Sequence, residues 1–264
     1  MTARRPKLAV FKFASCDGCQ LSILNLEDEL LALAEKVEIA NFLEASSRAD
    51  AEGPWDVTLV EGSVTTAHDV ERIRAIRTRS GVLITIGACA TSGGIQALRN
   101  RADVEAWKAQ VYPHPEWIDA LPRSTPIADH VKVDAEIQGC PVNAQQVLRV
   151  LVRALLGTQP DLPVASVCLE CKRRGNPCVL VTRGVPCMGP VTRAGCGAIC
   201  PALGRDCYGC FGPAADPNPA SLIRHFEAAG MARADAVRRL RHVNGWRPEL
   251  RSLADALEGR EPAP

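Results

Sequence analysis

The sequence predicts an α/β protein with a doubly wound parallel sheet, followed by a smaller irregular region that ends in short helices. Apolar segments typical of buried strands alternate with segments of helical periodicity through the first 160 residues. Eight of the 12 cysteines then fall between Cys168 and Cys210, and helical periodicity returns after Pro213. We therefore expect two domains in this 264-residue chain, residues 1–160 and residues 161–264.

The order of the expected elements supports a parallel sheet covered on both faces. Strands that alternate with helices need crossover connections, which place helices against the sheet. "GVLITIGAC" reads as a fully buried strand, and "VLRVLVRALLG" reads as an amphipathic helix. We expect strands at 7–15, 37–42, 55–62, 81–89 and 131–140, and helices at 20–37, 66–80, 142–157, 219–231, 232–243 and 247–260.

Charge and hydropathy exclude several classes of protein. The formal net charge is +1 from 31 basic and 30 acidic residues, so we expect no nucleic-acid partner. The most apolar helical segment is interrupted by Arg149 and Arg153, so we expect no membrane span. No apolar leader follows Arg4 and Arg5, which predicts a cytoplasmic protein. In that reducing compartment, 12 cysteines indicate metal or redox chemistry rather than disulfides.

Four cysteines lie where predicted parallel strands end. Cys16 and Cys19 follow the first strand in "SCDGC", Cys89 follows the buried strand in "IGACATSGG", and Cys140 follows the last strand in "QGCPV". The carboxyl ends of parallel strands share one edge of the sheet, and ligands bind there where the strand order reverses. The topology therefore predicts one four-cysteine site.

Two kinds of metal centre suit four thiolates. Zinc accepts them, and Cys-x-x-Cys is a common half of a zinc site. A 4Fe-4S cluster also takes four thiolates, and proline often follows one of its ligands, as in Cys140-Pro141 and Cys200-Pro201. The neighbouring glycines leave room for a bulky anionic cluster. We favour an iron-sulfur cluster, with zinc as the alternative.

The remaining eight cysteines are sufficient for two more four-ligand sites. No histidine lies between His130 and His225, which favours two all-cysteine cubanes over mixed sites, although a pair of zinc ribbons stays the alternative. Two partitions fit the spacing: sequential blocks, or ferredoxin-like exchange of the last ligand between clusters. The candidate ligands are Cys168, Cys171, Cys178, Cys187, Cys196, Cys200, Cys207 and Cys210.

Several of these motifs together resemble a known family. "SCDGCQLSILNLEDEL", "VEGSVTT", "IGACATSGGIQ" and "EIQGCPV" are similar to nickel-iron hydrogenase small subunits and to the related 20 kDa subunit of NADH:ubiquinone oxidoreductase. The spaced pair Cys16 and Cys19 resembles the hydrogenases, because the respiratory subunit has adjacent cysteines there. The cysteine-rich tail resembles the delta subunit of cytoplasmic NAD(P)-linked hydrogenases, or sulfhydrogenases.

This resemblance implies a fold, cofactors and partners. It implies a flavodoxin-like first domain with the proximal cluster, and a ferredoxin-like second domain with two further clusters, hence three 4Fe-4S clusters. It also implies two partners, a hydrogen-splitting large subunit and a flavin/NAD(P)-binding subunit, and it allows a further iron-sulfur subunit as a third. The isolated chain would have no activity, since it lacks nickel and dinucleotide motifs. The alternatives are a zinc-stabilised scaffold or a small subunit of a quinone-reducing respiratory complex.

Other residues carry open alternatives. Glu61, at the end of a predicted strand, is expected either to tune the first cluster or relay a proton, or only to satisfy nearby backbone amides. The proline-rich segment 111–126 reads as an insertion, either a packed surface loop or a cover for a subunit interface. Six basic residues could offset cluster charge, dock a partner or form a solvated face: Lys172, Arg173, Arg174, Arg183, Arg193 and Arg205.

Overall fold

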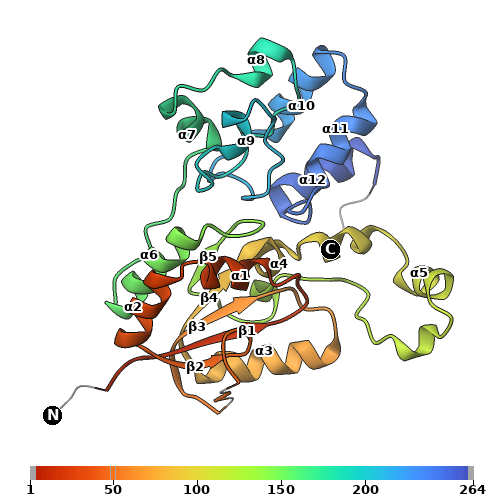
Figure 1. Cartoon of the computed structure of the whole chain (residues 1–264). Coiled ribbons are helices and arrows are strands. Elements are labelled where there is room, and N and C mark those ends of the chain that lie inside the picture. The colour runs from red at the N-terminus through yellow and green to blue at the C-terminus, as the bar shows by residue number, and fades with distance from the viewer. Residues whose placement is uncertain (1–3, 48, 51, 261–264) are drawn as a thin grey trace. The chain divides into compact units, whose positions relative to one another are not determined.

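The structure is a computed structural model that describes residues 4–47, 49–50 and 52–260. The backbone forms two compact units, residues 1–162 and residues 163–264 (Figure 1). Each unit has its own hydrophobic core. Which cofactors the units hold stays a prediction.

The first unit contains a five-stranded, all-parallel sheet in the order β2-β1-β3-β4-β5. This order is the flavodoxin-like doubly wound arrangement, in which the direction of winding reverses between β1 and β3. The predicted fold class is therefore confirmed. The strands are β1 Lys7–Lys12, β2 Glu38–Phe42, β3 Trp55–Glu61, β4 Ser80–Ile86 and β5 Ala135–Ile137.

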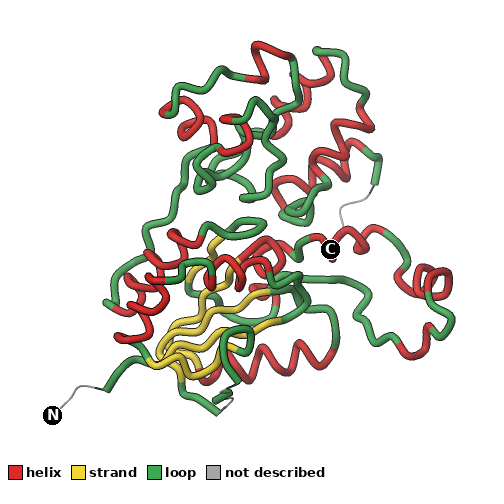
Figure 2. The backbone as a smooth tube through the Cα atoms, in the orientation of Figure 1, coloured by secondary structure: helices red, strands yellow, loops and turns green. Residues whose placement is uncertain are grey.

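Alternating side chains of each strand enter two different cores. Leu8 and Val10 of β1 belong to one apolar cluster, whereas Ala9 and Phe11 belong to the other. Because a strand has a two-residue period, this alternation buries the sheet on both faces. Figure 2 shows the strands lying between layers of helix. Helices α1 (Gly18–Leu24), α2 (Asp28–Lys36) and α6 (Ala144–Leu155) cover one face, and α3 (Ala67–Arg79) covers the other.

Two sequence-based boundaries were wrong. The expected helix 20–37 is broken into α1 and α2, because Glu27 adopts a left-handed φ of 47° between them. The strand expected at 131–140 shrinks to the three residues of β5. The pairing of β5 with β4 begins only at Ala135. Just before it, the side-chain carboxylate of Asp134 accepts a 2.8 Å hydrogen bond from the backbone amide of Leu83.

The segment between β4 and β5 is mostly short helical turns. It contains α4 (Gly87–Ser92), η1 (Ile95–Arg101), α5 (Val104–Val111), η2 (Pro115–Trp117) and η3 (Ile127–Asp129). The proline-rich insertion 111–126 lies within it. Trp117 there is 74% exposed, so its indole is not part of the core of this unit.

The second unit is built from short helices and loops. Only isolated bridges, such as Ser166 with Arg193, pair extended backbone among its described residues. The helices α7 (Val167–Arg173), α8 (Val179–Arg183) and α9 (Ile199–Ala202) lie in the cysteine-rich region. The predicted tail helices are confirmed as α10 (Pro219–Ala228), α11 (Arg233–Leu240) and α12 (Pro248–Leu257). No helix in the described part of the chain is long and apolar enough to cross a membrane.

Candidate metal centres

The sheet brings four of the predicted ligands to its carboxyl edge, which we call the rim. Cys16 follows β1, Cys19 lies in the first turn of α1, Cys89 lies within α4 directly after β4, and Cys140 follows β5. Residues 87–89, expected to end a strand, instead form the first turn of α4, so this helix carries Cys89. The rim lies at the reversal of strand order, where open α/β sheets bind ligands.

The rim thiols are close enough to affect one another electrostatically. Burial, then the charges of Cys140 and Cys16, raise the pKa of Cys89 to about 11. Burial raises the pKa of Cys140 as well, followed by the charge of Cys16. The pKa of Cys19 is raised by burial first, and then by Glu61, Cys89 and Cys140. Like charges that oppose ionisation in this way would be relieved by a bound cationic group, whose binding would release protons.

Glycines leave the space beside these thiols empty. A Cβ added at Gly87 would lie 2.4 Å from the sulfur of Cys19, and one at Gly94 would lie 2.5 Å from the sulfur of Cys89. Both glycines also have a positive φ, 86° at Gly87 and 63° at Gly94, where other residues are strained. Any side chain here would push a thiol away from the rim, so the donor set fits a bulky thiolate-bound group.

Glu61 and two glutamines position the rim. The Glu61 carboxylate, only 2% exposed, accepts a 3.1 Å hydrogen bond from the Cys19 backbone amide and a 2.8 Å bond from Gln20 Nε2. Burial raises the pKa of Glu61, although these two donors oppose that shift. Gln96 donates to the carbonyl of Ala14 at 2.9 Å. Neither glutamine was singled out from the sequence, because their contacts span about 40 to 80 residues of chain.

The first four tail cysteines lie around one pocket. Cys168, Cys171, Cys178 and Cys187 line it together with Gly189 and apolar side chains. A Cβ at Gly189 would lie 3.3 Å from the sulfur of Cys187 and 3.5 Å from that of Cys168. Burial is the main cause that raises the pKa of Cys168, and the charges of Cys187, Cys171 and Cys178 raise it further. These residues form one sequential block.

The last four tail cysteines differ in burial. Cys207 is buried, and burial, followed by the charges of Cys187 and Cys210, raises its pKa to about 12. The backbone amide of Cys207 also donates to the sulfur of Cys187 at 3.3 Å. Burial raises the pKa of Cys196, while the backbone amides of Ala198 and Ile199 lower it by donating to its sulfur. The hydrogen bond between Cys207 and Cys187 therefore joins a candidate ligand of one block to a candidate ligand of the other.

Three charged side chains tie the two blocks together. Arg174 donates to the carbonyl of Gly197 at 2.5 Å, and Arg183 donates to the carbonyl of Gly204 at 2.9 Å. Glu170, between Cys168 and Cys171, accepts a 2.9 Å bond from the backbone amide of Gly195. For Arg174 and Arg183, carbonyl binding is a role that charge counting on the sequence did not suggest.

No disulfide joins the 12 cysteines, which are all free. Within the residues described, no group of three or more His, Cys, Asp or Glu residues has the geometry to hold a metal ion. Such a group would share one ion, whereas the four thiolates of a 4Fe-4S cluster each bind a different iron.

A family model and individual relatives both match this chain. Residues 16–154 match the family described as NADH ubiquinone oxidoreductase, 20 Kd subunit. The sulfhydrogenase 2 subunit delta of Pyrococcus furiosus is 39% identical over 240 residues, which cover 91% of this chain and 100% of that protein. The delta subunit of the NAD-reducing hydrogenase HoxS of Cupriavidus necator is 31% identical and covers 60% of this chain and 82% of its own.

A solved structure agrees with these relatives. A chain of an NAD+-reducing [NiFe]-hydrogenase in the H2-reduced state matches with a TM-score of 0.55 and 34% identity, covering 61% of this chain and 96% of its own. The parallel sheet, the four-cysteine rim and these likenesses lead to one conclusion: the chain belongs to the NADH ubiquinone oxidoreductase 20 Kd subunit family, and within that family it is a hydrogenase subunit.

Proposed function

We propose that this chain is the electron-transferring small subunit of a cytoplasmic nickel-iron hydrogenase. In this proposal three 4Fe-4S clusters relay electrons between a hydrogen-splitting large subunit and a flavin/NAD(P)-binding subunit, with room for a further iron-sulfur subunit. The observation that carries it is the rim, where thiols from three separate strand ends converge beside glycines.

We assign the tail cysteines to two sequential sites. Cys168, Cys171, Cys178 and Cys187 would hold one cluster, because all four line one pocket. The charges of the other three also raise the pKa of Cys168. Cys196, Cys200, Cys207 and Cys210, the four that remain, would hold the other. The charges of Cys187 and then of Cys210 raise the pKa of Cys207, so Cys207 lies near thiols of both blocks. The rim would hold the third.

The protein's own groups would tune this relay. When bound, the clusters supply one-electron redox chemistry, with potentials set by hydrogen bonds to sulfur, by charge and by solvent exposure. The backbone amide of Cys207 donates to the sulfur of Cys187, so a short path of one hydrogen bond and the bonds of Cys207 itself would connect the two tail sites. Glu61 orients the Cys19 backbone through its amide and places a carboxylate beside the rim.

The relatives support the partners unequally. The Pyrococcus sulfhydrogenase subunit matches 91% of this chain, so its likeness extends over most of the cysteine-rich tail. The two NAD-reducing relatives match only 60% and 61% of this chain. We therefore infer the large-subunit partner from all three, and the flavin/NAD(P) partner from the names of the NAD-reducing relatives.

Metal and acid-labile sulfide content of the anaerobically purified chain test the proposal. Three cubanes predict about twelve iron and twelve sulfide per chain, and reduction should produce electron paramagnetic resonance signals of interacting 4Fe-4S centres. Copurification of a nickel-containing subunit, with hydrogen-dependent NAD(P)+ reduction by the complex, would support the partners. About four iron together with about two zinc would overturn the relay and make the tail a structural zinc module.

A further inference from the structure

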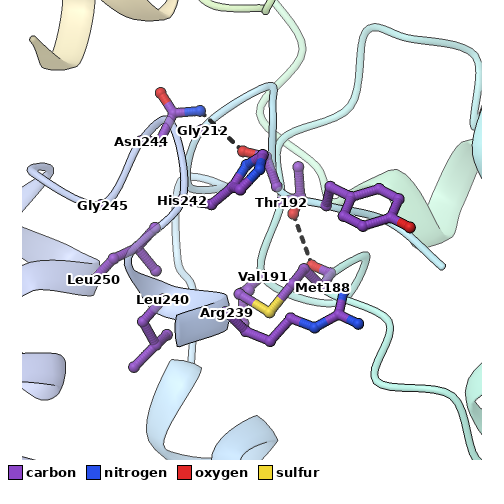
Figure 3. A pocket seen from close by; sticks show the side chains of 12 residues that line it. Met188, Val191, Thr192, Gly212, Arg239, Leu240, His242, Asn244, Gly245 and Leu250 are labelled. Carbon is purple, nitrogen blue, oxygen red and sulfur yellow. Dashed lines mark hydrogen bonds between the residues drawn. The ribbon is translucent and has the colours of Figure 1, made fainter. Parts of the chain in front are cut away.

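The turn between α11 and α12 contacts the loop that carries the last two cysteines (Figure 3). Asn244 in this turn is only 2% exposed, and its side-chain amide donates to two backbone carbonyls at once. Its Nδ2 lies 2.9 Å from the oxygen of Gly209 and 3.0 Å from the oxygen of Cys210.

The turn that presents Asn244 is held firmly. Arg241, at its start, is buried and forms ion pairs with Asp255 and, at 2.8 Å, with Glu258 of the α12 end. A Cβ at Gly245 would lie 2.7 Å from the Cα of Arg241, so the turn closes only with glycine at this position. Buried charged pairs of this kind fix geometry because breaking one leaves an unpaired charge. Asn244 is therefore presented from a rigid frame.

The contact has a direct consequence at a candidate ligand. The backbone amide of Gly209 donates to the sulfur of Cys207 at 3.5 Å, while the carbonyl of the same residue accepts from Asn244. Anchoring that carbonyl fixes the orientation of Gly209, whose φ is 79°. Hydrogen bonds to ligand sulfurs stabilise the more negative, reduced state of a cluster.

We propose that Asn244 is a positioning residue for the Cys207 and Cys210 metal centre, holding the Gly209 and Cys210 carbonyls so that the loop amide faces the Cys207 sulfur. This inference rests on the proposed function, because it needs a cluster at these cysteines. The helical tail then belongs to the redox site and is more than a packing element.

Two substitutions remove the amide donor from the full-length, anaerobically purified chain. Asn244→Leu keeps the approximate volume without a donor or a charge, and Asn244→Asp keeps the shape but replaces the donor by an acceptor. Leu222→Ala serves as the matched control, because Leu222 is buried in the same core and its truncation destabilises the unit through a cavity. The readouts are a redox titration followed by electron paramagnetic resonance, and the rate of iron release to a chelator.

We expect both Asn244 variants to lower the potential of one cluster and to release about one third of the iron at least tenfold faster, with the other clusters unchanged. Leu222→Ala should leave the potentials unchanged. Wild-type-like titrations of both variants, or the same selective shift in Leu222→Ala, would overturn the inference. Wild-type protein without about twelve iron would instead overturn the proposed function.

Asn244→Gln keeps the inference testable where the other variants fail to fold. It retains the amide donor on a side chain one methylene longer, so we expect a smaller shift confined to the same cluster. A uniform loss of iron from all clusters in this variant would count against positioning by Asn244, because the variant retains the amide donor.

Discussion

The two units assemble their candidate ligands in opposite ways. The rim collects Cys16, Cys19, Cys89 and Cys140 from positions more than 120 residues apart, and a sheet buried on both faces brings them together. The eight tail cysteines lie within 43 residues and have no sheet to hold them. In the first unit the sheet brings the four thiols together, whereas in the second unit two of the thiols are themselves part of the apolar core.

The composition of the two cores supports this contrast. Cys19 is the one rim thiol in the apolar clusters of the first unit. In the second unit Cys187 and Cys207 belong to the core itself, and Cys171 and Cys196 pack against it. Metal binding is coupled to folding where ligands form the core, so under the proposed function the second unit should depend on bound clusters much more strongly than the first.

The two units also differ in charge. Residues 163–264 contain 14 Lys and Arg against nine Asp and Glu, a formal charge of +5, whereas residues 1–162 have 17 against 21, a charge of −4. Thiolate-bound clusters are anionic, so two of them in the second unit would offset its excess of basic residues. The net charge of +1 for the whole chain hides this difference.

The largest expected effect tests this coupling directly. Cys187→Ser should remove about four iron per chain and unfold much of residues 163–264, because the free energy of metal binding is also folding free energy there. Cys140→Ser should also lose about four iron, but β1, β3 and β4 should stay protected from hydrogen exchange. Equal loss of protection in both units for the two variants would contradict the contrast.

A smaller effect is expected from closing the space at the rim. Gly87→Ala would place a methyl group 2.4 Å from the sulfur of Cys19, so the thiol must move and the rim cluster should be lost or much reduced. Gly157→Ala is the matched control, since Gly157 has a similar positive φ of 67° but no atom within 4 Å of an added Cβ. It should cost only about 1 kcal/mol of unfolding free energy and no iron. Full iron content in Gly87→Ala would show that the rim tolerates displacement of Cys19.

Sequence reasoning captured the topology and the ligand set better than the supporting contacts. Apolar strand segments that alternate with segments of helical periodicity predicted the sheet, and the strand ends placed Cys89 and Cys140 near each other. The break at Glu27 was missed, because helical periodicity continues through it and a left-handed φ leaves no pattern in apolar spacing. The expected tuning role of Glu61 stays a prediction, although its contacts to Cys19 and Gln20 are now described.

The contacts that tie the tail together could not be predicted for a physical reason. Arg174, Arg183 and Asn244 all donate to backbone carbonyls. Every residue has a backbone carbonyl, so the sequence does not indicate which one will accept the hydrogen bond. Such bonds depend on loop geometry 21 to 35 residues away. Charge alone suggested only offsetting, docking or solvation for the two arginines.

The arginine contacts give a third, smaller prediction. Arg183→Gln removes the bond to Gly204, so we expect iron release from the tail about twofold to tenfold faster, as fits a loss of about 0.5–1.5 kcal/mol for one hydrogen bond. Arg173→Gln makes the same charge change at an exposed residue with no described hydrogen bond or ion pair, and it should behave as wild type. Equal effects of both substitutions would assign the role of Arg183 to charge and not to the carbonyl contact.

The smallest effect concerns a pH-sensitive contact of the first unit that is independent of its thiols. His130 Nε2 lies 2.7 Å from Thr125 Oγ1, and the Thr125 backbone pairs with Val64. Burial lowers the pKa of His130 below 6.5, and Arg74 lowers it further, while Asp129 opposes the shift. The unfolded chain therefore binds a proton that the folded chain resists, so stability should fall as pH drops below about 6.5.

The measurement is hydrogen exchange at the Val64 and Thr125 amides between pH 7.5 and pH 5.5, corrected for intrinsic exchange rates. We expect protection to weaken toward pH 5.5 in the wild type, and less so in His130→Gln, which has no group titrating in this range. Because the first unit has an apolar core of its own, this change should be modest and should leave β3 and β4 protected. If protection across the sheet fell with it, the first unit would depend on peripheral contacts as much as the second depends on its thiols.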